Sequence, residues 1–169
     1  PMTRQEYLYD DIIDLDGAIE EHRRFTSILS RFANVLEVRT LLEETLASEE
    51  ARNFLIDRSI EITAFKSLSA LKDVAPAELA RSYIEGSAIP SGPFSRKLER
   101  DNYALPPLPN LFFTRDASMV IANQAVVSAM RFSSRWPEEA LMRTIYGYHP
   151  SFAGSEIIYD GSDERRKGF

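Results

Sequence analysis

Residues 109–116 read Pro-Asn-Leu-Phe-Phe-Thr-Arg-Asp, so an apolar run lies between an amide and a carboxylate that follows an arginine. Aromatic residues favour strands, and the run predicts a strand over residues 111–114. One interpretation is a buried strand with polar ends, in which Asp116 pairs with Arg115 or caps a turn. The other is one wall of a binding site, because side chains at the end of a strand can face a cleft. Spacing alone favours the first interpretation.

The residues after this stretch predict β structure and then a helix. Two strands are expected over residues 119–122 and 125–130, and the polar break at 123–124 suits a hairpin. A helix is expected over residues 136–146, because Pro137 would stand in its first turn, where proline is favoured.

The beginning of the chain predicts a helix, a strand and a second helix. Apolar residues three or four apart predict an amphipathic helix over residues 10–32. The alternating, β-branched residues 35–39 predict a short strand. Residues 40–43 match the capping-box pattern, so a helix is expected to begin at Leu41.

Residues 41–86 have a helix-favouring composition, and a compact helical subdomain is expected over about residues 41–100. Breaks are expected at Ser59 and at 73–76, where Pro76 suits the first turn of the last helix. Gly86 is expected to end that helix. The proline-rich residues 104–109 then predict an extended connector, because proline fixes φ and lacks an N–H donor.

Composition excludes several classes of function. The 169 residues include 20 basic and 26 acidic side chains, which is unfavourable for nucleic-acid binding, and the basic run at 164–167 is interpreted as a solvated tail. The absence of cysteine excludes disulfides, thiolate metal sites and a cysteine nucleophile from this chain. No apolar run approaches the roughly 20 residues of a membrane span, and no signal peptide is visible, so a cytoplasmic location is expected. Pro1-Met2 is not an ordinary translation start, which suggests a fragment.

The binding-site interpretation involves four side chains. Asp116 could accept hydrogen bonds from a guanidinium, the cation whose geometry best matches a carboxylate. Phe113 could form an apolar wall for a flat ligand, and Asn110 stands at the other end of the expected strand. Arg135, beyond the hairpin, could hold a ligand carboxylate by two parallel bonds.

Other polar residues have simpler explanations. His22, between the two faces of its helix, and His149, in a loop before proline, are both expected to be structural. The acidic pairs Asp10-Asp11 and Glu138-Glu139 suit helix starts, where negative charge is favoured. No pattern of phosphate-loop, metal-binding or nucleophile–base residues is found.

The stretch at 109–116 resembles the signature of the arginine deiminases, a proline-asparagine pair and an aromatic stretch that ends in Phe-Thr-Arg-Asp. Further blocks resemble this family in the same order along the chain, at residues 8–12, 21–25, 35–38, 41–46 and 144–150. The resemblance implies an α/β (α+β) fold, part of a five-module, pentein-like α/β propeller with an inserted helical bundle. It divides the chain into a first propeller module at 1–40, a helical insertion at 41–100 and propeller elements at 101–169.

The resemblance also implies a reaction, the hydrolysis of L-arginine to L-citrulline and ammonia. In this family a cysteine attacks the guanidinium carbon, a histidine moves protons, and no metal or organic cofactor is used. By resemblance, Asp116 would bind the substrate guanidinium, Asn110 and Arg135 its carboxylate and amino end, and Phe113 would be the aromatic wall. The catalytic cysteine and histidine have no counterpart in this chain, so no catalytic residue is assigned.

Three hypotheses therefore remain open. The chain is the N-terminal part of an arginine deiminase-like hydrolase, whose C-terminal part would be its partner. Alternatively, it is a non-catalytic remnant or interaction module, or part of a related amidinotransferase or guanidine hydrolase. A homo-oligomer is also expected, because part of a propeller leaves sheet edges and module faces uncovered. Neither nucleic acid nor membrane is expected as a partner.

Overall fold

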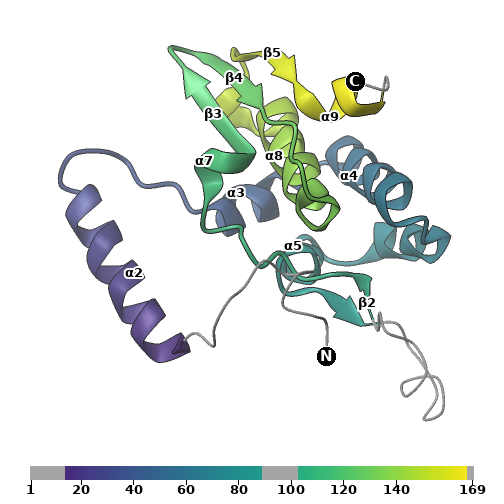
Figure 1. The fold of residues 1–169 in the computed structure, drawn as a ribbon, viewed down its shortest axis with the longest axis horizontal. Helices are drawn as coiled ribbons and strands as arrows, with labels where there is room; N and C mark the ends of the chain where they lie inside the picture. Colours follow the sequence, from purple (N-terminus) through teal and green to yellow (C-terminus); the bar gives the residue numbers. More distant parts are fainter. Residues whose placement is uncertain (1–13, 89–102, 167–169) are drawn as a thin grey trace.

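The computed structural model describes residues 14–88 and 103–166, and predictions for residues 1–13 lie outside this part of the chain. The elements in chain order are α2 (Leu15–Leu29), α3 (Val38–Thr45), α4 (Glu49–Thr63), the 3-10 helix η1 (Lys66–Asp73), α5 (Pro76–Glu85), β1 (Ser87–Ala88), β2 (Tyr103–Leu105), α7 (Thr114–Ala117), β3 (Ser118–Ile121), β4 (Gln124–Val127), η2 (Ser133–Arg135), α8 (Trp136–Tyr148), η3 (Pro150–Phe152), β5 (Glu156–Asp160) and α9 (Gly161–Arg166). The fold is thus mixed helix and sheet, as expected for an α+β protein (Figure 1).

The main sheet has the order β3-β4-β5. β3 and β4 form an antiparallel hairpin, as predicted, in which Ser118 pairs with Val127. The turn residues are Ala122 and Asn123, one position earlier than expected, and Ala122 adopts a φ of 57°. β5 lies parallel to β4, and α8 forms the crossover that a parallel connection requires.

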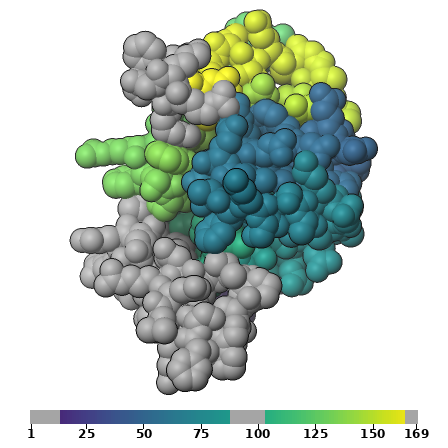
Figure 2. Space-filling view, turned by 90° about the vertical axis from the view of Figure 1, so that its right-hand side faces the viewer, coloured from purple at the N-terminus to yellow at the C-terminus, as the bar shows by residue number. Residues whose placement is uncertain are grey.

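The core lies between the helices and one face of this sheet. α4 packs against α8 and η1, and α3 packs against α5 and α8. Figure 2 looks onto a side where the blue and teal residues form one continuous surface, with yellow residues from the C-terminal part of the chain above them. Fully buried side chains include Leu42, Leu55, Leu79, Leu141 and Ile145. Burying a side chain of this size contributes about 1.5–3 kcal/mol, so these contacts hold the helices on the sheet.

The predicted limits of α5 are confirmed. The helix begins at Pro76, after the break expected at 73–76. It ends at Gly86, whose φ is 86°. A Cβ atom at this position would lie 2.9 Å from the backbone nitrogen of Pro107, so both the conformation and the space favour glycine.

The break predicted at Ser59 is wrong, because α4 continues through this residue to Thr63. The Ser59 hydroxyl donates to the carbonyl oxygen of Leu55 over 2.7 Å. A serine whose side chain bonds one turn back is compatible with a helix interior.

The strand predicted over residues 35–39 is also wrong. Residues 34–37 have no regular structure, and α3 begins at Val38 rather than at Leu41. A strand needs a neighbour for its hydrogen bonds, and none of the described strands lies beside these residues. As a helix, the same segment buries Leu41 and Leu42 against α5 and α8.

The predicted amphipathic helix is confirmed over Leu15–Leu29, but none of its residues is buried. α2 stands beside the rest of the molecule and is joined to α3 by the linker of residues 30–37 (Figure 1). Within the described ranges, no helix is long and apolar enough to cross a bilayer.

Candidate substrate-binding site

The stretch at 109–116 forms turns followed by the start of α7, and the strand predicted over residues 111–114 is wrong. The Phe113 N–H donates to the carbonyl oxygen of Asn110 over 2.9 Å, and the Asp116 N–H donates to that of Phe113 over 3.0 Å. α7 begins at Thr114, within this stretch, and leads into β3. Phe112 and Phe113 are 61% and 50% exposed, so the aromatic residues do not form the buried strand that their composition suggested.

These turns have a consequence for the site. Asn110, Phe113 and Asp116 are linked by two successive hydrogen bonds that each span three residues. In a strand, Asn110 and Asp116 would stand at opposite ends of the segment, whereas the turns shorten the separation between them.

Arg135 is positioned by the loop that precedes α8. Its N–H donates to the carbonyl oxygen of Phe132 over 3.0 Å. The indole N–H of Trp136 donates to the carbonyl oxygen of Met130 over 3.0 Å, and the Met130 N–H donates to the Glu139 carboxylate. The loop is therefore fixed to the first turn of α8, and the Arg135 side chain projects from a rigid backbone.

The Arg135 guanidinium contacts two other residues predicted for the site, Asn110 and Asp116, and also Glu138. Its Nη1 lies 2.9 Å from Oδ2 of Asp116. Its Nη2 lies 3.5 Å from the backbone oxygen of Asn110 and 2.8 Å from Oε2 of Glu138. Its Nε lies 3.1 Å from Oε1 of Glu138. The structure thus brings Asn110, Asp116 and Arg135 together, although they come from two separate segments.

Glu138 is the residue that sequence reasoning missed. Acidic residues in the first turn of a helix are explained by the helix dipole, and both Glu138 and Glu139 do lie in the first turn of α8. The spacing of Arg135 and Glu138, three residues apart, was the available signal, because such pairs are neighbours on a helix. We define the Asp116–Arg135–Glu138 cluster as these three side chains.

Burial and ion pairing shift the pKa values of Glu138 and Arg135 in this cluster. Glu138 is fully buried and Arg135 is 8% exposed. Burial raises the pKa of the Glu138 carboxyl, and pairing with Arg135 only partly offsets this effect. Burial opposes the charge of the Arg135 guanidinium, but hydrogen bonds to Glu138 and Asp116 outweigh it, so the pKa of Arg135 lies above its usual value.

Asp116 is the accessible member of the cluster. Its side chain is 51% exposed, whereas that of Glu138 is 0% exposed. Two carboxylates share one guanidinium, so the cluster carries one net negative charge when both carboxylates are ionised. The arrangement is therefore suited to attract a cation at Asp116.

Phe113 lies on the same turns as Asp116 and is half exposed. Its ring centroid lies 4.2 Å from that of Phe112, with the two planes tilted by 46°. This pair presents an aromatic surface to solvent beside the cluster, which is compatible with the predicted wall for a flat ligand.

The two histidines have structural partners. His22 is on the surface, and its Nε2 lies 3.3 Å from Oε1 of Glu37. His149 is buried, its Nδ1 accepts from the Ser151 N–H over 3.1 Å, and its Nε2 lies 2.9 Å from Oε2 of Glu44. The contact between His149 and Glu44 connects the loop after α8 to α3, in agreement with a structural function. In the part of the chain that the structure describes, no group of three or more His, Asp or Glu side chains could hold a metal ion.

The geometry is that of a mixed α+β protein with a cluster of carboxylates around a guanidinium. Residues 5–168 match the family model of arginine deiminase, which covers nearly the whole chain. The chain therefore belongs to the arginine deiminase family of hydrolases, as its motifs predicted.

Proposed function

We propose that this chain supplies the substrate-binding wall for the hydrolysis of L-arginine to L-citrulline and ammonia. Membership of the arginine deiminase family supports the reaction class. The observation that carries the proposal is the half-exposed Asp116, which is oriented by a buried guanidinium. A substrate guanidinium bound to Asp116 would balance the charge of the Asp116–Arg135–Glu138 cluster, giving two cations for two carboxylates.

Orientation of Asp116 favours this binding mode. The contact of Oδ2 with Arg135 restricts rotation of the carboxylate before the ligand arrives. A preoriented acceptor loses less side-chain entropy when it binds a cation. A charge-assisted pair between the carboxylate and the planar guanidinium would then fix the end of the substrate at which the reaction occurs.

The remaining predicted residues would serve the other parts of the substrate. Phe113, half exposed beside Asp116, is proposed to pack against the flat guanidinium. Asn110 and Arg135 are proposed to hold the carboxylate and amino end. For Arg135 this requires a rearrangement, because its Nε and Nη2 atoms donate to Glu138 and its side chain is buried.

The chemistry itself needs a nucleophile from elsewhere. Attack on the guanidinium carbon by a thiolate would form a covalent intermediate with release of ammonia, and water would then release citrulline. This chain contains no cysteine. We therefore propose that the thiol and the proton-transferring histidine come from residues beyond these 169, and that the chain alone does not turn over arginine.

The proposed architecture is one part of an α/β propeller in the cytoplasm. The β3-β4 hairpin followed by α8 and the parallel strand β5 would be one module, and residues 41–100 a helical insertion. If the same hairpin–helix–strand unit recurs in the rest of the enzyme's sequence, this division into modules is supported. An enzyme that transfers the amidino group instead of hydrolysing it would use the same binding wall. The residues around the nucleophile would distinguish the two reactions.

The experiment is a titration of the 169-residue chain with L-arginine, followed through the backbone amide signals in NMR. Arginine is expected to shift the signals of residues around Phe113 and Asp116. Asp116→Asn is expected to weaken this binding, because a hydrogen bond to a charged group contributes about 1.5–3 kcal/mol, or roughly 10- to 150-fold in affinity.

The matched control is Asp57→Asn, a second exposed carboxylate, which lies 3.7 Å from Lys72 and outside the site. It should bind arginine with the affinity of the wild type. The proposed guanidinium site would be contradicted if wild type and Asp116→Asn bound arginine equally well. It would also be contradicted if arginine did not shift the signals around Asp116.

A further inference from the structure

Three arginines lie in the two segments that form the site, residues 109–116 and 128–138. One of them, Arg135, is 8% exposed, and its donors are directed at Asp116 and Glu138. Binding of a ligand carboxylate by Arg135 would separate it from Glu138, and breaking a buried ion pair is strongly unfavourable. The cation that first meets a ligand carboxylate is therefore expected to be one of the other two arginines.

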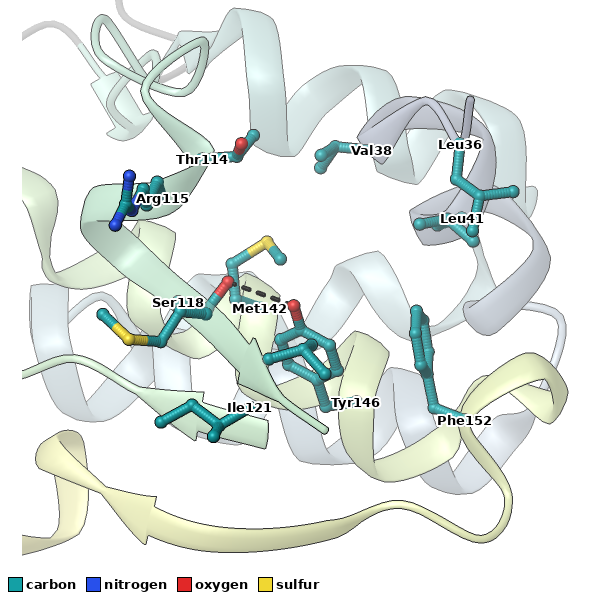
Figure 3. A pocket seen from close by; sticks show the side chains of 12 residues that line it. Leu36, Val38, Leu41, Thr114, Arg115, Ser118, Ile121, Met142, Tyr146 and Phe152 are labelled. Carbon is teal, nitrogen blue, oxygen red and sulfur yellow. Dashed lines mark hydrogen bonds between the residues drawn. The ribbon is translucent and has the colours of Figure 1, made fainter. Parts of the chain in front are cut away.

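Arg115 belongs to a different surface. It lines a pocket of about 650 Å³ between α3, β3, α8 and η3. Figure 3 shows Arg115 at one edge of this pocket, across from Leu36 and Leu41. Among the described residues, neither Asp116 nor Phe113 lines the pocket. Consecutive residues of a helix project about 100° apart, so Arg115 and Asp116 serve different sides of α7.

The backbone brings the third arginine, Arg131, to the side of Asp116. The N–H of Ser128 donates to the carbonyl oxygen of Ala117 over 3.0 Å, so the two arms of the hairpin stay adjacent up to the residue next to Asp116. The loop that begins at Ser128 therefore starts beside Asp116. It returns to Asp116 at Arg135, whose Nη1 lies 2.9 Å from Oδ2 of the carboxylate. Arg131 lies midway along this loop.

The Arg131 side chain is oriented but keeps its donors available. It is exposed, and its guanidinium carbon lies 5.7 Å from the ring centroid of Phe132. A cation–π contact uses the charge of the guanidinium and leaves the N–H donors at its edge for other partners. Among the described residues, no carboxylate pairs with Arg131. The preceding residue, Met130, is held to α8 by two hydrogen bonds, so the backbone that carries Arg131 is fixed.

We propose that Arg131 binds the carboxylate of the substrate and thereby selects amino-acid guanidines over guanidines that lack a carboxylate. This role rests on the proposed guanidinium site at Asp116 and extends it to the other end of the ligand. L-arginine carries a guanidinium at one end, for Asp116, and a carboxylate at the other, for Arg131. A guanidinium binds a carboxylate by two parallel hydrogen bonds. From its exposed position Arg131 makes this contact while Arg135 stays paired with Glu138.

Agmatine, which is L-arginine without its carboxylate, isolates this contact. Both ligands are titrated against the wild-type chain and Arg131→Met, and the dissociation constants are measured by NMR. The ratio of the agmatine constant to the arginine constant should fall at least about tenfold in Arg131→Met, because a hydrogen bond between charged groups is lost. The affinity for agmatine should not fall, because removal of a positive charge does not disfavour a cation. Thermal unfolding should not change, because Arg131 is exposed.

The matched control is Arg31→Met, which removes the same charge from an exposed position after α2 and should leave the ratio at its wild-type value. An unchanged ratio in Arg131→Met, or an equal loss of affinity for both ligands, would overturn the proposal.

Asp116→Asn separates this failure from failure of the guanidinium site. If Asp116→Asn weakens both ligands and Arg131→Met leaves the ratio unchanged, the guanidinium site stands and the role of Arg131 is wrong. If Asp116→Asn binds both ligands as tightly as wild type does, the guanidinium site and the role of Arg131 are both wrong.

Discussion

α2 and α8 are both helices that the sequence predicts, α2 from the spacing of its apolar residues and α8 from Pro137 at its first turn, yet their surroundings differ completely. In α8, nine of 13 residues are buried, whereas in α2 none of 15 is buried. α8 is the crossover between two parallel strands, so the sheet and the helices α3 and α4 cover it. The difference teaches that a local sequence pattern predicts a helix, while the surface that covers the helix depends on which other elements lie nearby.

The largest difference in stability is expected between two ion pairs, one on each helix. Glu138→Ala in α8 should lower the free energy of unfolding by about 3–5 kcal/mol, because Arg135 loses its main buried partner. Glu20→Ala in α2 removes the contact with Arg24, an exposed pair, and should cost less than about 0.5 kcal/mol. Urea denaturation of both variants measures the difference. Similar losses would mean that the two pairs have similar environments.

The same comparison holds for apolar residues of one type. Ile145→Ala in α8 should cost about 2–5 kcal/mol, because the deleted atoms leave a cavity in the core. Ile19→Ala in α2 should change stability by at most about 0.5 kcal/mol when the chain is dilute and monomeric. Chemical denaturation at low protein concentration provides the test. A large loss for Ile19→Ala would place α2 in the core of the monomer.

A small effect is expected at Asp116, although it contacts the same guanidinium as Glu138. Asp116 is half exposed, so solvent screens its pairing with Arg135. Asp116→Asn should therefore cost only about 0.2–1 kcal/mol of stability. Thermal unfolding of Asp116→Asn beside Glu138→Gln compares the two partners directly. An effect of Asp116→Asn as large as that of Glu138→Gln would contradict the assignment of Asp116 as the binding member and Glu138 as the structural one.

Some elements could be predicted because their determining signal is local. Pro137 in the first turn of α8 and the residues that delimit α5, Pro76 and Gly86, act through their own backbone preferences. The β3-β4 hairpin was predicted because two apolar runs flank a short polar turn. In these cases the prediction did not depend on the rest of the molecule.

Other elements depend on distant neighbours and could not be predicted. Residues 35–39 have strand-like composition, but the described strands offer them no edge, so α3 begins at Val38 instead. β5 received no prediction, although Ile157, Ile158 and Tyr159 are favourable strand residues, because its formation depends on the free edge of β4. The aromatic residues at 112–113 were assigned to a strand, and the turns formed instead.

The site was predicted in part. Asp116, Asn110 and Arg135 were grouped by family resemblance, and the structure brings them together. Their direct contact with one another could not be predicted, because no spacing rule connects residues on either side of a hairpin. Glu138 was missed because the helix start gave its charge a sufficient local explanation.

The central claim is that Asp116 binds a guanidinium, and its most direct test compares two ligands of nearly the same shape. L-arginine carries a guanidinium, whereas L-citrulline carries a neutral ureido group in its place. Titrated against the wild-type chain, arginine should bind at least tenfold more tightly than citrulline, and high salt should reduce the difference because it screens exposed charge. Equal affinity for arginine and citrulline would contradict the claim.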